Sequence, residues 1–155
     1  LGSGTAFRIY LPAARSAGQA PAPEQIEASV SDTMRTILLV DDEDAVRAVA
    51  ADMLVALGYE VIAAATGNQA VEIFAEQHER IDLVLLDIVM PGMGGGQVYT
   101  RFREIDPSVQ VLLCSGYSIQ GEANRVLRMG ASGFIQKPFT LDAISRAIKS
   151  ILGEE

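Results

Sequence analysis

Three aspartates follow apolar runs of the sequence, at positions where their carboxylates could act together. Asp41 and Asp42 come directly after residues 37–40, and Asp87 comes directly after residues 83–86. Taken alone, Asp41 and Asp42 are better explained as acidic residues at the start of a helix, and Asp87 as a turn former. If the two runs are neighbouring strands, however, the three carboxylates repel one another unless a cation holds them. Oxygen-only ligation with open positions suits Mg²⁺, which also takes phosphate groups, so these residues predict a divalent-metal site.

Two further polar residues follow later apolar runs. Ser115 ends the fourth run and precedes Gly116, which has no side chain to obstruct a ligand, and Lys137 follows the fifth run. Neither residue is informative alone, since such a lysine could simply pair with a surface acid. Beside a carboxylate cluster, the Lys137 ammonium could instead neutralise phosphoryl oxygens. The bond between Lys137 and Pro138 is also a candidate cis peptide, because X-Pro bonds alone readily adopt that form.

The elements that must position these residues are five short apolar runs separated by helical patterns. The runs begin at residues 37, 61, 83, 109 and 133 and are mostly unalternated, which predicts strands buried on both faces. Their spacing fits one strand plus one crossover helix each time. The sequence therefore predicts an α/β fold with a flavodoxin-like, doubly wound, five-stranded parallel sheet in the order 2-1-3-4-5 and with five helices. In that order the first and third strands are neighbours, which brings Asp41, Asp42 and Asp87 to the edge where sites of such sheets form.

The intervening segments have helical periodicity. The first helix carries one continuous apolar face, which consists of Val46, Val49, Ala50, Met53, Leu54 and Leu57. Gly58 should end this helix, and Thr66 should cap the second. Gly94, Gly95 and Gly96 should loosen the start of the third helix, since glycine costs roughly 1 kcal/mol per helical position. The segment 119–129 has only a weak apolar stripe and should form the least firmly held helix.

Composition excludes several classes of protein. The 155 residues carry 12 Lys and Arg against 20 Asp and Glu, for a net charge of −8, which argues against direct binding to nucleic acid. The longest stretch without charged residues, 107–121, is too short and too polar to cross a bilayer, so we expect no direct membrane contact. A single cysteine, Cys114, cannot form an internal disulfide and should be a small buried residue, which fits a reducing, cytoplasmic setting.

At the residues described above, the sequence resembles the receiver domain of two-component response regulators. The resemblance covers residues 35 to about 152 and rests on four motifs in the order and spacing of that family: ILLVDDE at 37–43, LLDIVMPGM at 85–93, CSG at 114–116 and GASGFIQKPF at 130–139. Any one of these motifs is a weak signal, whereas four in register are a strong one.

The resemblance implies a phosphoryl-transfer site. Asp87 would be the phosphoacceptor and would take a phosphoryl group from a phosphohistidine of a partner. Asp41 and Asp42 would hold Mg²⁺, together with Asp87 and the backbone carbonyl of Val89, and Lys137 would pair with the phosphoryl group. Phosphotransfer and dephosphorylation would both be self-catalysed.

The resemblance also implies a conformational switch. Ser115 would contact the phosphoryl group, and its movement would open space for an aromatic side chain on the fifth strand, Phe134. Two residues that flank the site, Val89 and Tyr117, are apolar and bulky where a polar side chain could steer water. We therefore expect the acyl phosphate to be hydrolysed slowly.

The beginning of the chain predicts a larger parent protein. Residues 1–12 resemble the closing strand of the ATP-binding domain of sensor histidine kinases, residues 13–34 have the composition of a flexible linker, and residues 35–153 form the receiver domain. The implied parent is a hybrid sensor histidine kinase with this receiver at its C-terminal end. Its phosphodonor would be a histidine kinase dimerisation domain or a histidine phosphotransfer protein. A stand-alone single-domain response regulator is the alternative.

Two other classes fit the sequence less well. A phosphatase of the haloacid dehalogenase family also phosphorylates an aspartate, but places it on the first strand in an Asp-x-Asp pattern that residues 41–44 do not match. A receiver that serves only as an interaction module, without taking phosphate, would lack one of the site residues. The complete set Asp41, Asp42, Asp87, Ser115 and Lys137 argues against that class.

Overall fold

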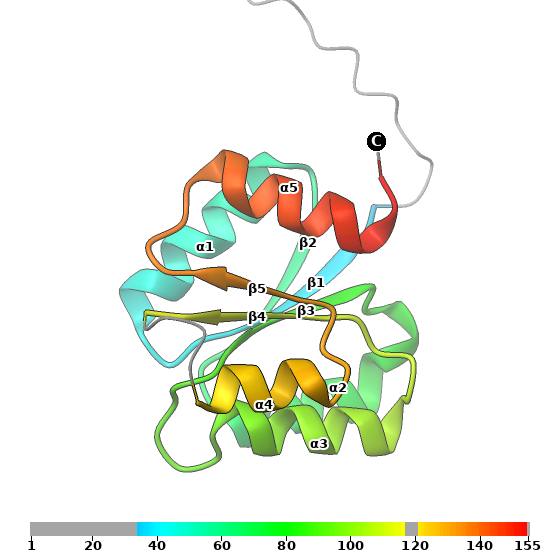
Figure 1. The fold of residues 1–155 in the computed structure, drawn as a ribbon. Coiled ribbons are helices and arrows are strands. Elements are labelled where there is room, and N and C mark those ends of the chain that lie inside the picture. Colours follow the sequence, from blue (N-terminus) through cyan, green and yellow to red (C-terminus); the bar gives the residue numbers. More distant parts are fainter. Residues whose placement is uncertain (1–33, 117–120, 155) are drawn as a thin grey trace, which may run out of the picture. The chain divides into compact units, whose positions relative to one another are not determined.

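Figure 1 shows the computed structural model, which describes residues 34–116 and 121–154. The predictions for residues 1–12 and for the linker up to residue 33 lie outside the described residues. The described elements are, in chain order, β1 (Thr36–Val40), α1 (Asp44–Ala56), β2 (Glu60–Ala64), α2 (Gly67–Gln77), the short 3₁₀ helix η1 (His78–Arg80), β3 (Leu83–Asp87), α3 (Gly95–Ile105), β4 (Val111–Ser115), α4 (Glu122–Arg128), β5 (Gly133–Gln136) and α5 (Leu141–Leu152).

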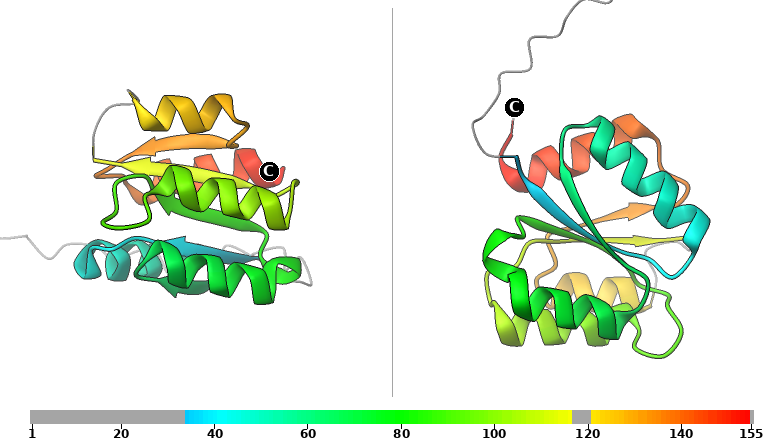
Figure 2. Two further views of the ribbon diagram at one scale, coloured as in Figure 1. Left: turned by 90° about the horizontal axis from the view of Figure 1, so that it is seen from below. Right: turned by 180° about the vertical axis from the view of Figure 1, so that it is seen from behind.

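The strands form one parallel sheet in the order β2-β1-β3-β4-β5, which confirms the predicted fold class and topology. Helices cover both faces: α1 and α5 lie on one side of the sheet, and α2, α3 and α4 lie on the other (Figures 1 and 2). Because crossover connections carry the chain from one strand end back to the other, the carboxyl ends of all five strands lie along the same edge.

Side chains of successive strand residues enter two separate cores. On β1, Leu38 and Val40 pack with α2, α3 and α4, whereas Ile37 and Leu39 pack with α1 and α5. The three central strands β1, β3 and β4 are buried along their full length. A strand buried on both faces has no polar side to alternate with, which explains the continuous apolar runs in the sequence.

Thr66 and Gly58 begin and end helices as predicted, and Thr140 caps a further helix. The Thr66 hydroxyl accepts a hydrogen bond from the Gln69 N–H (3.2 Å) at the start of α2, and the Thr140 hydroxyl accepts one from the Ala143 N–H (3.2 Å) at the start of α5. Gly58 follows α1 with a φ of 90°, a left-handed conformation that favours glycine. Short polar side chains and glycine therefore define these boundaries.

The fourth strand and the apolar face of α1 show details that the sequence pattern did not predict. The fourth strand begins at Val111 and not at residue 109, because Val109 still belongs to the preceding turn, where its N–H bonds to the Asp106 carbonyl (3.2 Å). The apolar face of α1 is not buried throughout, since the Val49 side chain is 55% exposed. The weakly patterned fourth helix is short, and only its residues Ala123 and Val126 are buried.

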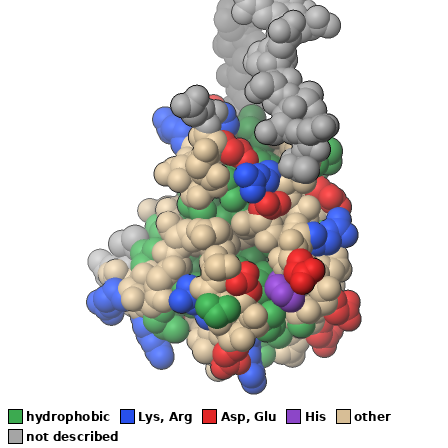
Figure 3. Space-filling model, turned by 90° about the vertical axis from the view of Figure 1, so that its right-hand side faces the viewer, with side chains coloured by type: hydrophobic (Ala, Val, Ile, Leu, Met, Phe, Trp, Pro, Cys, Tyr) green, Lys and Arg blue, Asp and Glu red, His purple; other side chains and the backbone are tan. Residues whose placement is uncertain are grey.

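None of the described helices is long and apolar enough to span a bilayer. On the face drawn in Figure 3, acidic and basic side chains are interspersed and are not sorted by sign.

Candidate functional site

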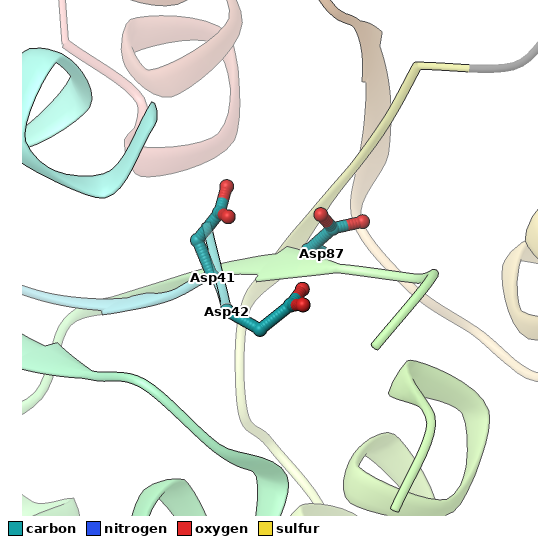
Figure 4. A group of neighbouring side chains, drawn as sticks. All are labelled: Asp41, Asp42 and Asp87. Carbon is teal, nitrogen blue, oxygen red and sulfur yellow. The ribbon is translucent and has the colours of Figure 1, made fainter. Parts of the chain in front are cut away.

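Three aspartates meet at the carboxyl edge of the sheet. Asp41 and Asp42 follow the end of β1, and Asp87 is the last residue of the neighbouring strand β3 (Figure 4). Each of the three offers a carboxylate oxygen, and these oxygens all lie within 4.8 Å of one another. Asp41 and Asp87 are buried, whereas Asp42 is half-buried. The parallel pairing of β1 with β3 is what brings together residues that lie far apart in the chain.

The polar atoms of Asp41 are all hydrogen-bonded. Its backbone N–H donates to the Ala64 carbonyl (3.2 Å), and its carbonyl accepts from the Arg47 guanidinium (2.7 Å). One carboxylate oxygen accepts from the Glu43 N–H (3.0 Å), and the other accepts from Lys137 Nζ (2.6 Å). Asp41 is therefore held in one orientation before any ligand arrives.

Lys137 joins two of the aspartates. From the end of β5 its Nζ donates to Asp41 Oδ2 at 2.6 Å and to Asp87 Oδ2 at 2.5 Å. Its backbone N–H donates to the Ser115 carbonyl (2.8 Å), which ties the segment after β5 to the end of β4. The peptide bond to Pro138 is cis, as predicted. Burial alone would lower the pKa of the Lys137 ammonium, but the hydrogen bonds to Asp41 and Asp87 outweigh burial and raise it.

The Asp87 carboxylate lies in a partly desolvated position. Burial raises the pKa of the Asp87 carboxyl above its ordinary value, although the hydrogen bonds from Lys137 and from the Val89 N–H (2.9 Å) work against this rise. Desolvation destabilises the ionised form of a carboxylate, so a further cationic partner would stabilise the charged Asp87 side chain.

The donor set fits a hard divalent cation. Three carboxylates and a single ammonium leave an excess of negative charge in a small, mostly buried volume. The Asp42 carboxylate accepts no hydrogen bond from the part of the chain that the structure describes, so it is open to a ligand. Oxygen donors with free positions are what Mg²⁺ takes in proteins.

Of the other residues that the sequence singled out, Tyr117 lies outside the described residues, whereas Ser115, Val89 and Phe134 are described. Ser115 is buried at the end of β4, and its strand neighbour Cys114 pairs in register with Asp87. The Val89 side chain is 56% exposed at the mouth of the site. Phe134 is half-buried on β5 beside Leu113, and packs against the core formed with α2, α3 and α4.

Sequence reasoning missed an apolar groove beside Asp87. The groove has a volume of about 800 Å³, and its apolar wall is formed by Val46, Val49, Ala50 and Met53 of α1 together with Val89, Pro138 and Phe139. The apolar stripe on α1 was the signal in the sequence for this groove. The exposed valine on α1 therefore faces a cleft next to the phosphoacceptor candidate.

Arg47, the partner of the Asp41 carbonyl, was also missed. The one available signal was its position three residues after Asp44, a helical spacing that suits an ion pair. His78, at the start of η1, is half-buried and contacts the Phe74 ring, with a centroid distance of 6.0 Å. Cys114 is a buried thiol, and burial raises its pKa.

Comparisons with known proteins agree on one family. A family model described as the response regulator receiver domain matches residues 37–149. The chain is 38% identical to the chemotaxis protein CheY of Bacillus subtilis, over 75% of this chain and 96% of that protein. It is 35% identical to the sensor kinase CckA of Brucella abortus over 100% of this chain, but spans only 17% of that protein.

A solved structure gives the same picture. The fold resembles a chain in the crystal structure of the CheX–CheY–BeF₃–Mg²⁺ complex from Borrelia burgdorferi, with a TM-score of 0.72 and 28% identity, over 76% of this chain and 88% of that chain. The geometry at the carboxyl edge of the sheet and the similarity to known proteins thus point to the same kind of domain.

Proposed function

Since the chain belongs to the response regulator receiver domain family, we propose that Asp87 accepts a phosphoryl group from a phosphohistidine and that the domain then switches conformation. The observation that carries the proposal is the convergence of Asp41, Asp42, Asp87 and Lys137 at one edge of the sheet. In this arrangement a nucleophilic carboxylate, a cation site and a fixed ammonium lie within reach of one transferred group.

Each residue has a distinct role in the proposed transfer. An Asp87 carboxylate oxygen attacks phosphorus, an O–P bond forms, and the P–N bond to the donor imidazole breaks with its electron pair returning to nitrogen. Asp41, Asp42, Asp87 and the Val89 backbone carbonyl would hold Mg²⁺. When bound, this ion supplies charge neutralisation for the transferred phosphoryl group.

Lys137 changes partner during the transfer. In the unphosphorylated protein its ammonium is shared between Asp41 and Asp87. Once Asp87 carries the phosphoryl group, the Asp41 hydrogen bond can remain while the ammonium turns to a phosphoryl oxygen. Because the Asp41 carboxylate is held independently by the Glu43 N–H, it can anchor Lys137 in both states.

The switch would begin at Ser115. Its hydroxyl would be drawn to a phosphoryl oxygen, and the segment that follows β4 would move with it. Phe134, half-buried on the adjacent strand β5, could then move further into the core. Phenylalanine has no hydroxyl, so a partner would detect its rotamer by shape alone.

The donor would approach through the apolar groove beside Asp87. A protein-bound histidine can reach Asp87 only if its carrier packs closely around the mouth of the site, and the exposed Val49 and Val89 offer apolar surface there. A histidine on the surface of a helix, as in a histidine kinase dimerisation domain or a histidine phosphotransfer protein, would suit a groove lined by another helix.

A hybrid sensor histidine kinase is the favoured parent. The similarity to the sensor kinase CckA extends over the whole of this chain, including residues before the receiver domain, whereas the similarity to CheY covers 75% of it. Such a parent would place this domain in the cytoplasm and would act as a histidine kinase. A stand-alone response regulator is the second candidate, supported by the coverage of almost the whole of CheY.

Phosphoryl transfer can be tested directly with a small acyl-phosphate donor and Mg²⁺. We expect the intact protein to gain the mass of one phosphoryl group in a linkage that hydroxylamine cleaves, and Asp87→Asn to gain none. Asp52→Asn, which alters an exposed carboxylate on α1, is the matched control and should behave like the wild type. Equal labelling of Asp87→Asn, or labelling undiminished by a chelator, would refute the proposal.

A second experiment separates the two candidate parents. The protein is incubated with the phosphorylated dimerisation domain of the kinase encoded in its own parent chain, and separately with those of other sensor kinases, and the label is followed over time. Transfer from the kinase of the same chain at least as fast as from any separate kinase supports the hybrid parent. Exclusive transfer from a separate kinase supports a stand-alone regulator.

A further inference from the structure

Arg47 reaches from the first turns of α1 back to the aspartate pair. Its Nη1 donates to the Asp41 carbonyl at 2.7 Å, and its Nη2 lies 2.5 Å from Asp44 Oδ1. Its side chain is 19% exposed, against 43–61% for the three other ion-paired arginines of the described chain, Arg35, Arg80 and Arg101. A guanidinium this far removed from water stays in place only because its hydrogen bonds compensate for the lost hydration.

The Asp41 carbonyl oxygen, which Arg47 binds, belongs to the peptide group that links Asp41 to Asp42. The Asp41 carbonyl and the Asp42 N–H belong to the same peptide unit, which is planar. Fixing the carbonyl oxygen therefore fixes the plane from which the Asp42 backbone and side chain continue.

The orientation of the Asp42 carboxylate depends on this peptide plane more than that of the Asp41 carboxylate does. The Asp41 carboxylate is independently held by the Glu43 N–H and by Lys137. No corresponding hydrogen bond to the Asp42 carboxylate occurs among residues 34–116 and 121–154. The direction of the Asp42 carboxylate is thus set by its backbone, and the backbone is set in part by Arg47.

We propose that Arg47 is a positioning residue for the divalent-metal site: it locks the peptide between Asp41 and Asp42 so that both carboxylates face Asp87 before the cation binds. The inference rests on the proposed function, since it concerns the same site. Such residues contact a metal-ligating residue and not the metal itself. Their replacement commonly changes metal affinity by about 10- to 100-fold.

The sign of the effect distinguishes positioning from simple electrostatics. Arg47 carries a positive charge close to a site for a cation, so removing that charge alone would strengthen Mg²⁺ binding. Loss of positioning has the opposite effect. A weaker affinity in a variant without the guanidinium therefore cannot come from the change in charge.

The test is Mg²⁺ titration of the unphosphorylated protein by calorimetry. We expect Arg47→Met to bind Mg²⁺ about tenfold more weakly than the wild type, and Arg47→Lys, which can still donate to the Asp41 carbonyl, to recover part of the loss. The matched control is Arg101→Met, because Arg101 forms an ion pair of the same spacing with Glu104, on α3. Its affinity should be unchanged. An Arg47→Met variant that binds Mg²⁺ as tightly as the wild type, or more tightly, would overturn the inference.

A second measurement uses the metal-free protein and separates positioning from loss of fold. Amide exchange of Glu43, whose N–H bonds to Asp41 Oδ1, should accelerate in Arg47→Met, while the amides of β4 remain protected as in the wild type. Unchanged Glu43 exchange would contradict the proposal, and faster exchange throughout would show a general loss of stability instead. A wild-type protein that binds no Mg²⁺ would refute the proposed function as well, whereas equal binding by wild type and variant refutes the role of Arg47 alone.

Discussion

At the scale of single residues, Lys137 and a metal ion would share the same carboxylates. The ammonium lies between Asp41 and Asp87, where it offsets the repulsion of the two acids in the protein as described. A divalent cation bound by the same residues has to draw the Asp87 oxygens partly away from it. Lys137 thus stabilises the carboxylate cluster and would at the same time compete with a bound cation.

This competition gives a prediction with two opposite effects. Lys137→Met should bind Mg²⁺ more tightly in the unphosphorylated state, yet accept phosphoryl groups more slowly by about 100-fold, since a fixed charge on the transferred group is lost. Lys149→Met, on the outer part of α5, is the control because these are the only two lysines of the chain. Calorimetry and the labelling rate are the measurements, and a variant with weaker Mg²⁺ binding would contradict the idea of competition.

Val89 gives a second prediction at this scale. Its side chain is exposed at the mouth of the site and cannot hydrogen-bond to an attacking water. Val89→Gln should therefore shorten the lifetime of the acyl phosphate by about tenfold, which is less than the roughly 10²-fold effect of a fully positioned general base.

The lifetime is measured by following the decay of label after the donor is removed. The matched control is Val55→Gln, because Val55 is also an exposed valine but lies on α1. This variant should leave the lifetime unaltered. A wild-type half-life of seconds in the presence of Mg²⁺ would show that Val89 does not protect the acyl phosphate.

At the scale of elements, the start of α3 packs closely against the backbone of Asp87, the proposed phosphoacceptor. A Cβ atom on Gly95 would lie 2.5 Å from the Asp87 carbonyl oxygen and 2.7 Å from the Ile88 Cα, and both of these are backbone atoms. The neighbouring Gly94 has no such restriction, since its nearest contact would be 3.9 Å away. Glycine is therefore required at position 95 for close approach, whatever it costs in helix propensity.

We accordingly expect Gly95→Ala to lower the free energy of unfolding by about 1–3 kcal/mol, because the overpacked backbone cannot move aside cheaply. The better helix propensity of alanine would offset at most about 1 kcal/mol. Gly94→Ala, at the N-cap of the same helix, should change stability by much less. Urea unfolding of both variants is the measurement, and equal stabilities would show that α3 can shift away from Asp87 without cost.

At the scale of the whole molecule, the described core is contained in the receiver domain. Both apolar cores are built from residues between Ile37 and Leu152, and the family match spans residues 37–149. A chain that begins at Met34 should therefore unfold at the same temperature as the full chain. A midpoint lowered by more than about 4 °C, the shift expected for roughly 1 kcal/mol, would mean that the earlier residues contribute to the fold.

Much of the site was predictable from the sequence for a physical reason. Strands buried on both faces leave long apolar runs, and the run lengths and spacing determine a parallel sheet whose carboxyl ends share one edge. Once the order of the strands is assigned, Asp41, Asp42 and Asp87 must meet there. The parallel sheet thus follows from local periodicity and chain connectivity, whereas the strand order comes from the flavodoxin-like pattern.

Only the tertiary structure decided the features that depend on packing between elements. The sequence shows a continuous apolar stripe on α1, but whether Val49 is buried depends on how much of that stripe the sheet and α5 cover. Likewise, the Lys137 bridge, the contact between Arg47 and the Asp41 carbonyl, and the close approach of Gly95 to Asp87 are set by distances between backbones that pack at fixed positions. The periodicity of the sequence assigns a residue to one face of a helix or strand. Whether another element covers that residue is determined by the packing of the whole fold.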